Sequence, residues 1–427
     1  MRGEGEDSGC AWAGGVEPIG TSVEPNNSLL GWSPTLFAAS APFSFHSVTT
    51  FTIHSPFLFT PNLCFLQYLL PLSSSSPYPY TFATPPPRIP LPHGTQESTE
   101  QTTDIHTPFR WGQASAIIQQ TLWIHGGKTD PYNQFSYTSA PNTNDLFRLD
   151  LNQSFDLSNP PWHTQGSCSN NVGCQGPRMA FHSLSAYDTT HMLMFGGQPD
   201  PNSDIVLLDR PDSAWTLDVG NRDSPSWINE ARGWANEPSR RIFHSASSSG
   251  GKVFITGGQK ADGSQTALNQ HEVFDYTGPT FTALPTTNGP PDLYGHTSLV
   301  LRNGSLLVFG GYSQSQGALL PFSTIWILDT WADTSTWSMI RIDNTTLPSG
   351  RRNFAAVVLS DGRILIHGGS DAVLQTTFSD GWILDTTKDP MAWTHVDSLS
   401  TLGPRRDHMV VAIGSVVIFG FGAPSVQ

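Results

Sequence analysis

Between Arg351 and Trp393, short apolar runs alternate with turn residues in a pattern typical of an antiparallel sheet. Asp361-Gly362 is a hairpin signal, because glycine tolerates the positive φ that tight turns require. The pattern predicts four strands, at Phe354–Leu359, Arg363–His367, Gly381–Asp385 and around Trp393. One such sheet cannot bury both of its faces alone, so the chain should contain further copies of it.

A strand that ends in a glycine doublet recurs along the chain. Its five copies end at Gly126-Gly127, Gly196-Gly197, Gly257-Gly258, Gly310-Gly311 and Gly368-Gly369. A sixth copy, VVIFGFG, is altered: Phe421 follows Gly420, where the second glycine is expected. Aromatic residues that mark the fourth strand follow four of the doublets, at Trp162, Phe281, Trp337 and Trp393. The repetition predicts six copies of one small sheet.

Arginines precede the first strand of five copies. They are Arg110, Arg178, Arg240-Arg241, Arg351-Arg352 and Arg405-Arg406, while the fourth copy has Asp292-Leu293. This order of arginine, apolar strand, turn, glycine doublet, aspartate-ending strand and tryptophan resembles the kelch repeat, whose period is about 50 residues. The chain resembles the fungal kelch-repeat proteins of the galactose oxidase-like group. The resemblance implies a β-propeller over residues 106–427 but no oxidase activity, because a fold does not carry a function.

The expected fold is all-β, a six-bladed kelch propeller in which each copy is one blade. The last blade shows two inner strands and no outer pair before Gln427, so either the ring closes imperfectly or the sequence is truncated. Residues 1–105 contain Pro/Ser-rich stretches and no strand that ends in a glycine doublet. Segments of this composition cannot repay the entropy of ordering, so a disordered N-terminal segment is expected.

Charged residues make up 13% of the chain, and its net charge is −14. Few charges and many Gly and Pro residues suit short strands joined by turns. The acidic balance disfavours nucleic acid and anionic membranes as partners, because both bind basic surfaces. Phe57–Leu72 is apolar but interrupted, and it is shorter than the ~20 residues that span a bilayer. No membrane anchor is therefore expected in this chain, although the proteins it resembles often have one.

The resemblance to galactose oxidase raises the question of copper radical chemistry. Such a site would require a cysteine crosslinked to a tyrosine, a second tyrosine and two histidines. No cysteine lies in a predicted blade strand, because the propeller region contains only Cys168 and Cys174, both in one loop. We therefore expect no catalytic residue, no metal and no cofactor. A sugar or alcohol oxidase, or another carbohydrate-active enzyme, is the alternative.

Three histidines occupy one register of the first strand in copies two to four: His182, His244 and His296. They could bind a metal only if their nitrogens converged to about 2.1 Å from one point. Residues related by blade rotation stay apart, so each ring is expected to hydrogen-bond a neighbouring blade instead.

The recurrence of the arginines places them on one face of the propeller. A guanidinium can donate five hydrogen bonds, so a structural role is expected, in which the arginines bind loop carbonyls or carboxylates. The alternative is a ring of exposed arginines that binds an acidic partner. Its candidate residues are Arg178, Arg241, Arg352 and Arg406.

Two further features concern the compartment. The short CSNNVGC loop makes a disulfide between Cys168 and Cys174 sterically reasonable, with two free thiols as the alternative. Glycosylation sequons begin at Asn152, Asn303 and Asn344, each in a predicted turn. With the resemblance, these features favour a secretory, extracellular or cell-surface location. The N-terminus lacks the basic-then-apolar order of a signal peptide and, read literally, favours the cytoplasm.

The predicted function is that of a non-enzymatic interaction scaffold, expected to be a monomer. Three loop inserts, at 128–144, 218–239 and 312–323, should project from one propeller face. Small and aromatic residues dominate them, and such surfaces can bind a protein or a glycan.

Overall fold

The computed structural model describes residues 109–423, apart from 131, 133, 157–158, 166–175, 202–212, 230–232, 333–334 and 344–345. All of these residues lie in one compact unit of the chain. This part of the chain is all-β, and its single helical segment is the short 3₁₀ helix η1 (Asp397–Leu402). The N-terminal segment 1–105 lies outside the described residues, so its disorder and the domain boundary remain predictions.

Five sheets of the described part have four antiparallel strands, joined in chain order. The first contains β2 (Ala114–Ile118), β3 (Thr121–His125), β5 (Leu146–Asp150) and β6 (His163–Thr164). The second contains β7 (Met179–Ala186), β8 (His191–Pro199), β9 (Ala214–Asp218) and β10 (Ser226–Ile228). The third contains β12 (Ser245–Ser249), β13 (Lys252–Thr256), β15 (His271–Asp275) and β16 (Thr280–Ala283).

The fourth sheet contains β18 (Thr297–Val300), β19 (Ser305–Phe309), β22 (Thr324–Asp329) and β23 (Trp337–Arg341). The fifth contains β24 (Ala355–Val358), β25 (Ile364–His367), β26 (Gly381–Asp385) and β27 (Ala392–His395), close to the four predicted strands. The sixth contains β28 (Met409–Ile413) and β29 (Val416–Gly420). Short strands form three small sheets: β1 (Arg110–Trp111) with β4 (Lys128–Thr129), β11 (Arg241–Ile242) with β14 (Gln259–Lys260), and β17 (Leu293–Tyr294) with β20 (Tyr312–Ser313) and β21 (Ala318–Leu319).

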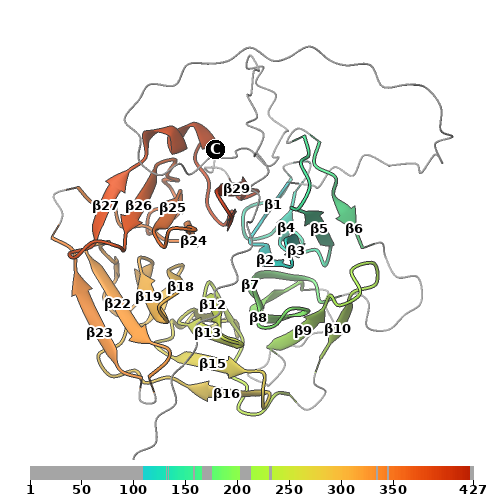
Figure 1. The fold of residues 1–427 in the computed structure, drawn as a ribbon, viewed down its shortest axis with the longest axis horizontal. Helices are drawn as coiled ribbons and strands as arrows, with labels where there is room; N and C mark the ends of the chain where they lie inside the picture. Colours follow the sequence, from blue (N-terminus) through green and yellow to red (C-terminus); the bar gives the residue numbers. More distant parts are fainter. Residues whose placement is uncertain are drawn as a thin grey trace, which may run out of the picture. The chain divides into compact units, whose positions relative to one another are not determined.

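The first strands of the six sheets contact one another in a cycle. In order, β2 contacts β7, β7 contacts β12, β12 contacts β18, β18 contacts β24, β24 contacts β28, and β28 contacts β2. Figure 1 shows the sheets arranged around a common centre, with the later strands of each sheet farther out. This all-β arrangement of antiparallel sheets is consistent with a kelch β-propeller.

Aromatic residues of the fourth strands join each sheet to the one before it. The indole N–H of Trp393 donates to the Phe322 carbonyl (2.9 Å), and that of Trp337 donates to the Pro285 carbonyl (2.7 Å). Trp162 packs against Phe421 of the sixth sheet, with ring centroids 6.4 Å apart. These buried side chains fill the space between neighbouring sheets, which no single sheet could close by itself.

The glycine doublets occupy the corner where one sheet meets the next. All ten glycines have positive φ, from 54° to 97°. The N–H of a second glycine donates to a backbone carbonyl just before the next sheet, as from Gly369 to Arg405 (2.9 Å). In the same way, the Gly422 N–H donates to the Arg110 carbonyl (2.9 Å) and links the sixth sheet to the first. The doublets therefore form the backbone hydrogen bonds that connect neighbouring sheets.

The predicted register of the sixth copy was wrong. Met409 pairs with Gly420 as Ala355 pairs with His367, so Gly420 corresponds to the last strand residue and not to a doublet glycine. Phe421 (φ 61°) stands at the first doublet position, and Gly422 (φ 98°) stands at the second. A Cβ is crowded at either doublet position: it would lie 2.5 Å from His408 Cβ on Gly422 and 2.3 Å from the Arg405 carbonyl oxygen on Gly368.

The predicted insert 218–239 was also wrong in part. It contains β10, which completes the second sheet by pairing with β9. Trp227 on β10 is buried and packs against His125, at 4.6 Å between ring centroids. It is therefore the fourth-strand aromatic of its sheet and not part of a projecting loop.

Replacing a doublet glycine should cost more stability than replacing a turn glycine with the same backbone angle. Gly369 (φ 93°) and Gly362 (φ 92°) belong to the same sheet region, but only a Cβ on Gly369 would meet other atoms, at 2.8 Å from Phe354 Cβ. Gly362→Ala should lose about 1–2 kcal/mol from backbone strain, and Gly369→Ala roughly 1–3 kcal/mol more from overpacking. Denaturant unfolding measures both, and equal losses would contradict the role given to the doublets.

Candidate functional site

The loops that follow the glycine doublets gather at one end of the sheets, which we call the insert face. There β4 pairs with β1, β14 with β11 and β20 with β17, so each of these inserts is tied to the segment that precedes its own sheet. The predicted inserts 128–144 and 312–323 both lie on this face. The hairpin turns between first and second strands lie at the opposite end.

Six residues in equivalent positions surround the centre of this face. They are Gly112, Phe181, Phe243, Gly295, Asn353 and Asp407, all with φ between 52° and 63°. Backbone N–H groups connect them, as from Asp407 to Asn353 (3.0 Å) and from Gly112 to Asp407 (3.1 Å). With the residues that follow them, they line a central cavity of about 150 Å³.

Asp407 is the centre of the polar part of this ring. Its carboxylate accepts hydrogen bonds from the Tyr137 hydroxyl (2.6 Å) and the Asn353 amide (2.6 Å). Burial raises the pKa of Asp407 and raises the pKa of Tyr137 well above its ordinary value. These contacts fix the insert 128–144 to the sixth sheet, which the sequence could not indicate because the two residues are 270 positions apart.

Arginines of the face form two groups. Arg110, Arg241 and Arg351 are fully buried and donate to the carbonyls of Gly126 (3.0 Å), Gly257 (3.2 Å) and Gly368 (3.0 Å). The expected structural role is confirmed for these three. The guanidiniums of Arg352 and Arg406 instead lie over tyrosine rings, at 5.2 Å from Tyr294 and 4.5 Å from Tyr137.

The alternative of an exposed arginine ring does not hold for Arg241 and Arg406, which are 0% and 1% exposed. Their side chains lie inside the inter-sheet packing because they satisfy buried carbonyl and hydroxyl groups of the inserts, as Arg406 does at Thr377 (3.0 Å). Arg178 is exposed and Arg352 half-buried, so only these two of the four candidates can meet a partner directly.

The histidines bridge neighbouring sheets. His182 Nε2 lies 3.0 Å from His125 Nδ1, His244 Nε2 lies 2.9 Å from Ser183 Oγ, and His296 Nε2 lies 2.8 Å from Thr256 Oγ1. The prediction that each ring bonds the neighbouring sheet is confirmed. Burial lowers the pKa of His182 and His296 to about 3, so both rings are neutral at physiological pH.

Other predicted residues are placed as follows. Trp162, Trp337 and Trp393 are buried, while Asn152 and Asn303 are exposed and accessible to a glycan. Cys168, Cys174 and Asn344 lie outside the described residues, so the disulfide and the third sequon stay predictions. No helix of the described part has the length and apolarity needed to cross a bilayer.

Exposed apolar side chains stand on two loops of the insert face. Tyr132, Phe135 and Val373 are 79%, 49% and 67% exposed. In each loop one carboxylate holds the backbone: Asp130 accepts from the Phe135 N–H (2.8 Å), and Asp371 accepts from the Thr376 N–H (2.9 Å). Hydrogen bonds to these carboxylates therefore hold the backbone of the segments that carry Phe135 and Val373, an arrangement that lowers the entropy cost of binding.

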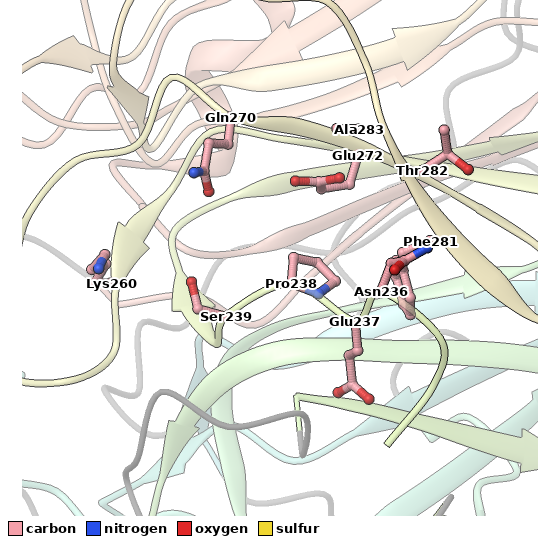
Figure 2. A pocket seen from close by; sticks show the side chains of 10 residues that line it. All are labelled: Asn236, Glu237, Pro238, Ser239, Lys260, Gln270, Glu272, Phe281, Thr282 and Ala283. Atoms are coloured by element: carbon pink, nitrogen blue, oxygen red, sulfur yellow. The ribbon is translucent and has the colours of Figure 1, made fainter. Parts of the chain in front are cut away.

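A second, larger cavity of about 640 Å³ lies beside the third sheet. Figure 2 shows its lining, with Gln270 just before β15 and Glu272 within β15 on one side, and Pro238 and Ser239 of the connection from the second sheet on the other. The Glu237 carboxylate is used elsewhere, because it accepts hydrogen bonds from Ser213, Ala214 and Trp234.

Comparison with known proteins finds similarity to proteins that contain kelch repeats. The KLHDC2/KLHL20/DRC7 Kelch-repeats domain matches residues 213–422. Adagio-like protein 1 of Oryza sativa subsp. japonica is 30% identical over 58% of this chain and 38% of its own length. Adagio protein 3 of Arabidopsis thaliana is 27% identical over 68% of this chain and 43% of its own. Kelch domain-containing protein 3 of Bos taurus is 24% identical over 69% of this chain and 70% of its own.

The chain thus spans about two fifths of the length of these plant relatives. The domain match covers the two outer strands of the second sheet and all of the third to sixth sheets, and the match to the bovine relative covers 69% of the chain. The sheets, the glycine doublets and the sequence matches together show that residues 213–422 are similar to a kelch-repeat domain.

Proposed function

We propose that the six sheets are the blades of one kelch propeller and that the chain acts as a non-enzymatic interaction scaffold. The insert face binds a protein partner, with a glycan as the other possible ligand, and the chain acts as a monomer. The narrower kinship with the fungal, galactose oxidase-like group stays a hypothesis.

The observation that carries this proposal is the exposure of Tyr132, Phe135 and Val373 on loops whose backbones are fixed by Asp130 and Asp371. Large apolar groups exposed on ordered loops mark interaction surfaces, and aromatic residues dominate binding hot spots. The half-buried Arg352, which lies over the Tyr294 ring, adds hydrogen-bond donors to the same face. Similarity to kelch-repeat proteins supports the same function.

Removing the three exposed groups should abolish partner capture without unfolding the protein. The variant Tyr132→Ser/Phe135→Ser/Val373→Ser deletes apolar area on the insert face, and partners should be captured at least about tenfold less, since each hot-spot residue contributes roughly 2 kcal/mol. Trp331→Ser is the matched control, because Trp331 is 67% exposed beside the Gly304 turn at the opposite end of its sheet.

Quantitative affinity capture by wild type, triple variant and control measures the effect, with thermal melting as the check on folding. Equal loss in the control and the triple variant, or no loss in either, would contradict the assignment of binding to the insert face.

A further inference from the structure

One position in the repeat breaks its chemical pattern. In the third strand of four sheets, the residue that pairs with the position two residues before the first doublet glycine is aromatic: Phe147, Trp215, Trp326 and Trp382. In the third sheet this residue is Glu272, which pairs with Ile255. A carboxylate therefore stands where the other sheets have a large ring.

The 640 Å³ cavity coincides with this exchange. In the fifth sheet the Trp382 ring packs on His395 of the outer strand, at 4.8 Å between centroids. In the third sheet both partners are smaller, because Glu272 pairs with Ala283 on β16. Both residues line the cavity, so the space corresponds to the missing aromatic ring and its outer-strand neighbour.

Glu272 also lacks a partner for its charge. The residue is 9% exposed, and its carboxylate has no hydrogen bond or ion pair with any residue that the structure describes. Burial raises the pKa of Glu272, and the field of Arg241 lowers it only in part. Glu237, also at the cavity, shows the contrast: four donors satisfy its carboxylate. A buried, unpaired carboxylate costs stability unless a ligand compensates it.

The remaining cation at the cavity does not fill this role. Lys260 borders the space, but it has a partner of its own, and its charge is not among the causes of the shifted pKa of Glu272. Polar groups of Asn236, Gln270 and Thr282 line the rim and can accept or donate hydrogen bonds.

We propose that this cavity is a binding site for an organic cation, an alkylammonium or guanidinium group, with Glu272 as its counter-ion. Such a group has an alkyl part that can fill the space left by the missing aromatic ring. Its charged end can form charge-assisted hydrogen bonds with the Glu272 carboxylate. The net charge of −14 favours the approach of cations. The cation belongs either to a Lys or Arg side chain of a protein partner, which would rest on the scaffold function above, or to a free amine.

The test uses the full chain and small probes. Propylguanidinium and propylammonium should bind the wild type, as measured by ligand-observed NMR and thermal shift, while neutral propionamide should not. Glu272→Gln should weaken both cations at least about tenfold, because it removes a charge-assisted contact. Asp275→Asn is the matched control: it removes a carboxylate from the opposite end of the same strand and should leave binding unchanged.

A second variant separates binding from folding. Glu272→Trp installs the residue found in the fourth and fifth sheets, and it should fill the cavity, abolish cation binding and raise the melting temperature. Equal binding by Glu272→Gln and wild type, or no cation binding by the wild type, would overturn the proposal.

Capped peptides with a single Arg or Lys distinguish the two sources. Binding at least as tight as that of the free cation identifies a protein side chain, and weaker binding identifies a free amine. Because small probes do not require the insert face, a failed capture experiment and a failed cation site give different results.

Discussion

Lowering the pH from 7 to 5 is expected to unfold this domain or to reduce its melting temperature by roughly 15 °C or more. The cause is a set of buried, neutral histidines. Burial lowers the pKa of His182 and His296 to about 3 and the pKa of His271 and His367 to about 4. In the unfolded chain each would titrate near 6.5.

The sign follows from proton binding. Between pH 6.5 and pH 4 the unfolded state binds protons that the folded state rejects, so the free energy of unfolding falls as the pH falls. At pH 5 the loss is about 2 kcal/mol per histidine, and four of them lose an amount comparable to the ~5–15 kcal/mol of a typical domain. The raised pKa values of Asp407, Glu237 and Glu272 oppose this trend, but these groups are fewer.

Denaturant unfolding at several pH values checks the expectation. His296→Gln is an informative variant, because glutamine can keep the bond to Thr256 Oγ1 but does not titrate. Its pH dependence should be shallower than that of the wild type. A free energy of unfolding that stays constant from pH 7 to pH 5 would contradict the assignment of these rings as buried and neutral.

Replacing Arg351 by methionine is expected to destabilise the domain by about 3–5 kcal/mol, the usual cost of breaking a buried ion pair. The Arg351 guanidinium is fully buried and donates to both oxygens of Asp380 (2.6 and 2.9 Å) and to the Gly368 carbonyl (3.0 Å). Without it, a half-buried carboxylate and a buried carbonyl lose their donors. The same contact ties the start of the fifth sheet to its glycine corner.

Arg363→Met is the matched control in the same sheet. Arg363 pairs with Asp361 at 2.6 Å, but both side chains reach solvent, so its loss should cost at most about 1 kcal/mol. Denaturant unfolding of both variants gives the comparison. Similar losses in the free energy of unfolding for the two variants would show that the Arg351 contacts do not stabilise the glycine doublet of the fifth sheet.

Much of the fold was predictable from the sequence because the repeat uses strong local signals. Turn glycines and period-two apolar runs located the strands of the fifth sheet, including β26 at the predicted bounds. The register at Phe421 failed because a phenylalanine with φ of 61° has no signature in the pattern. β10 was missed because it is only three residues long and follows a polar turn.

The candidate site was less predictable, since it depends on contacts between distant copies. The pairing of Tyr137 with Asp407 could not be found from spacing. Glu272 carried a usable signal: a comparison of third strands by register shows one carboxylate among four aromatic residues. That comparison requires the five third strands to be aligned by register. The irregular insert lengths make this alignment hard to find in the sequence.

The bond from Gly422 to the Arg110 carbonyl has a kinetic consequence. It joins segments more than 300 positions apart, so it can form only after the intervening sheets have brought the two segments near each other. Closing so large a loop costs entropy that local contacts do not repay, and topologies dominated by distant pairings assemble slowly. The junction of the first and last sheets is therefore expected to be the last to form during folding.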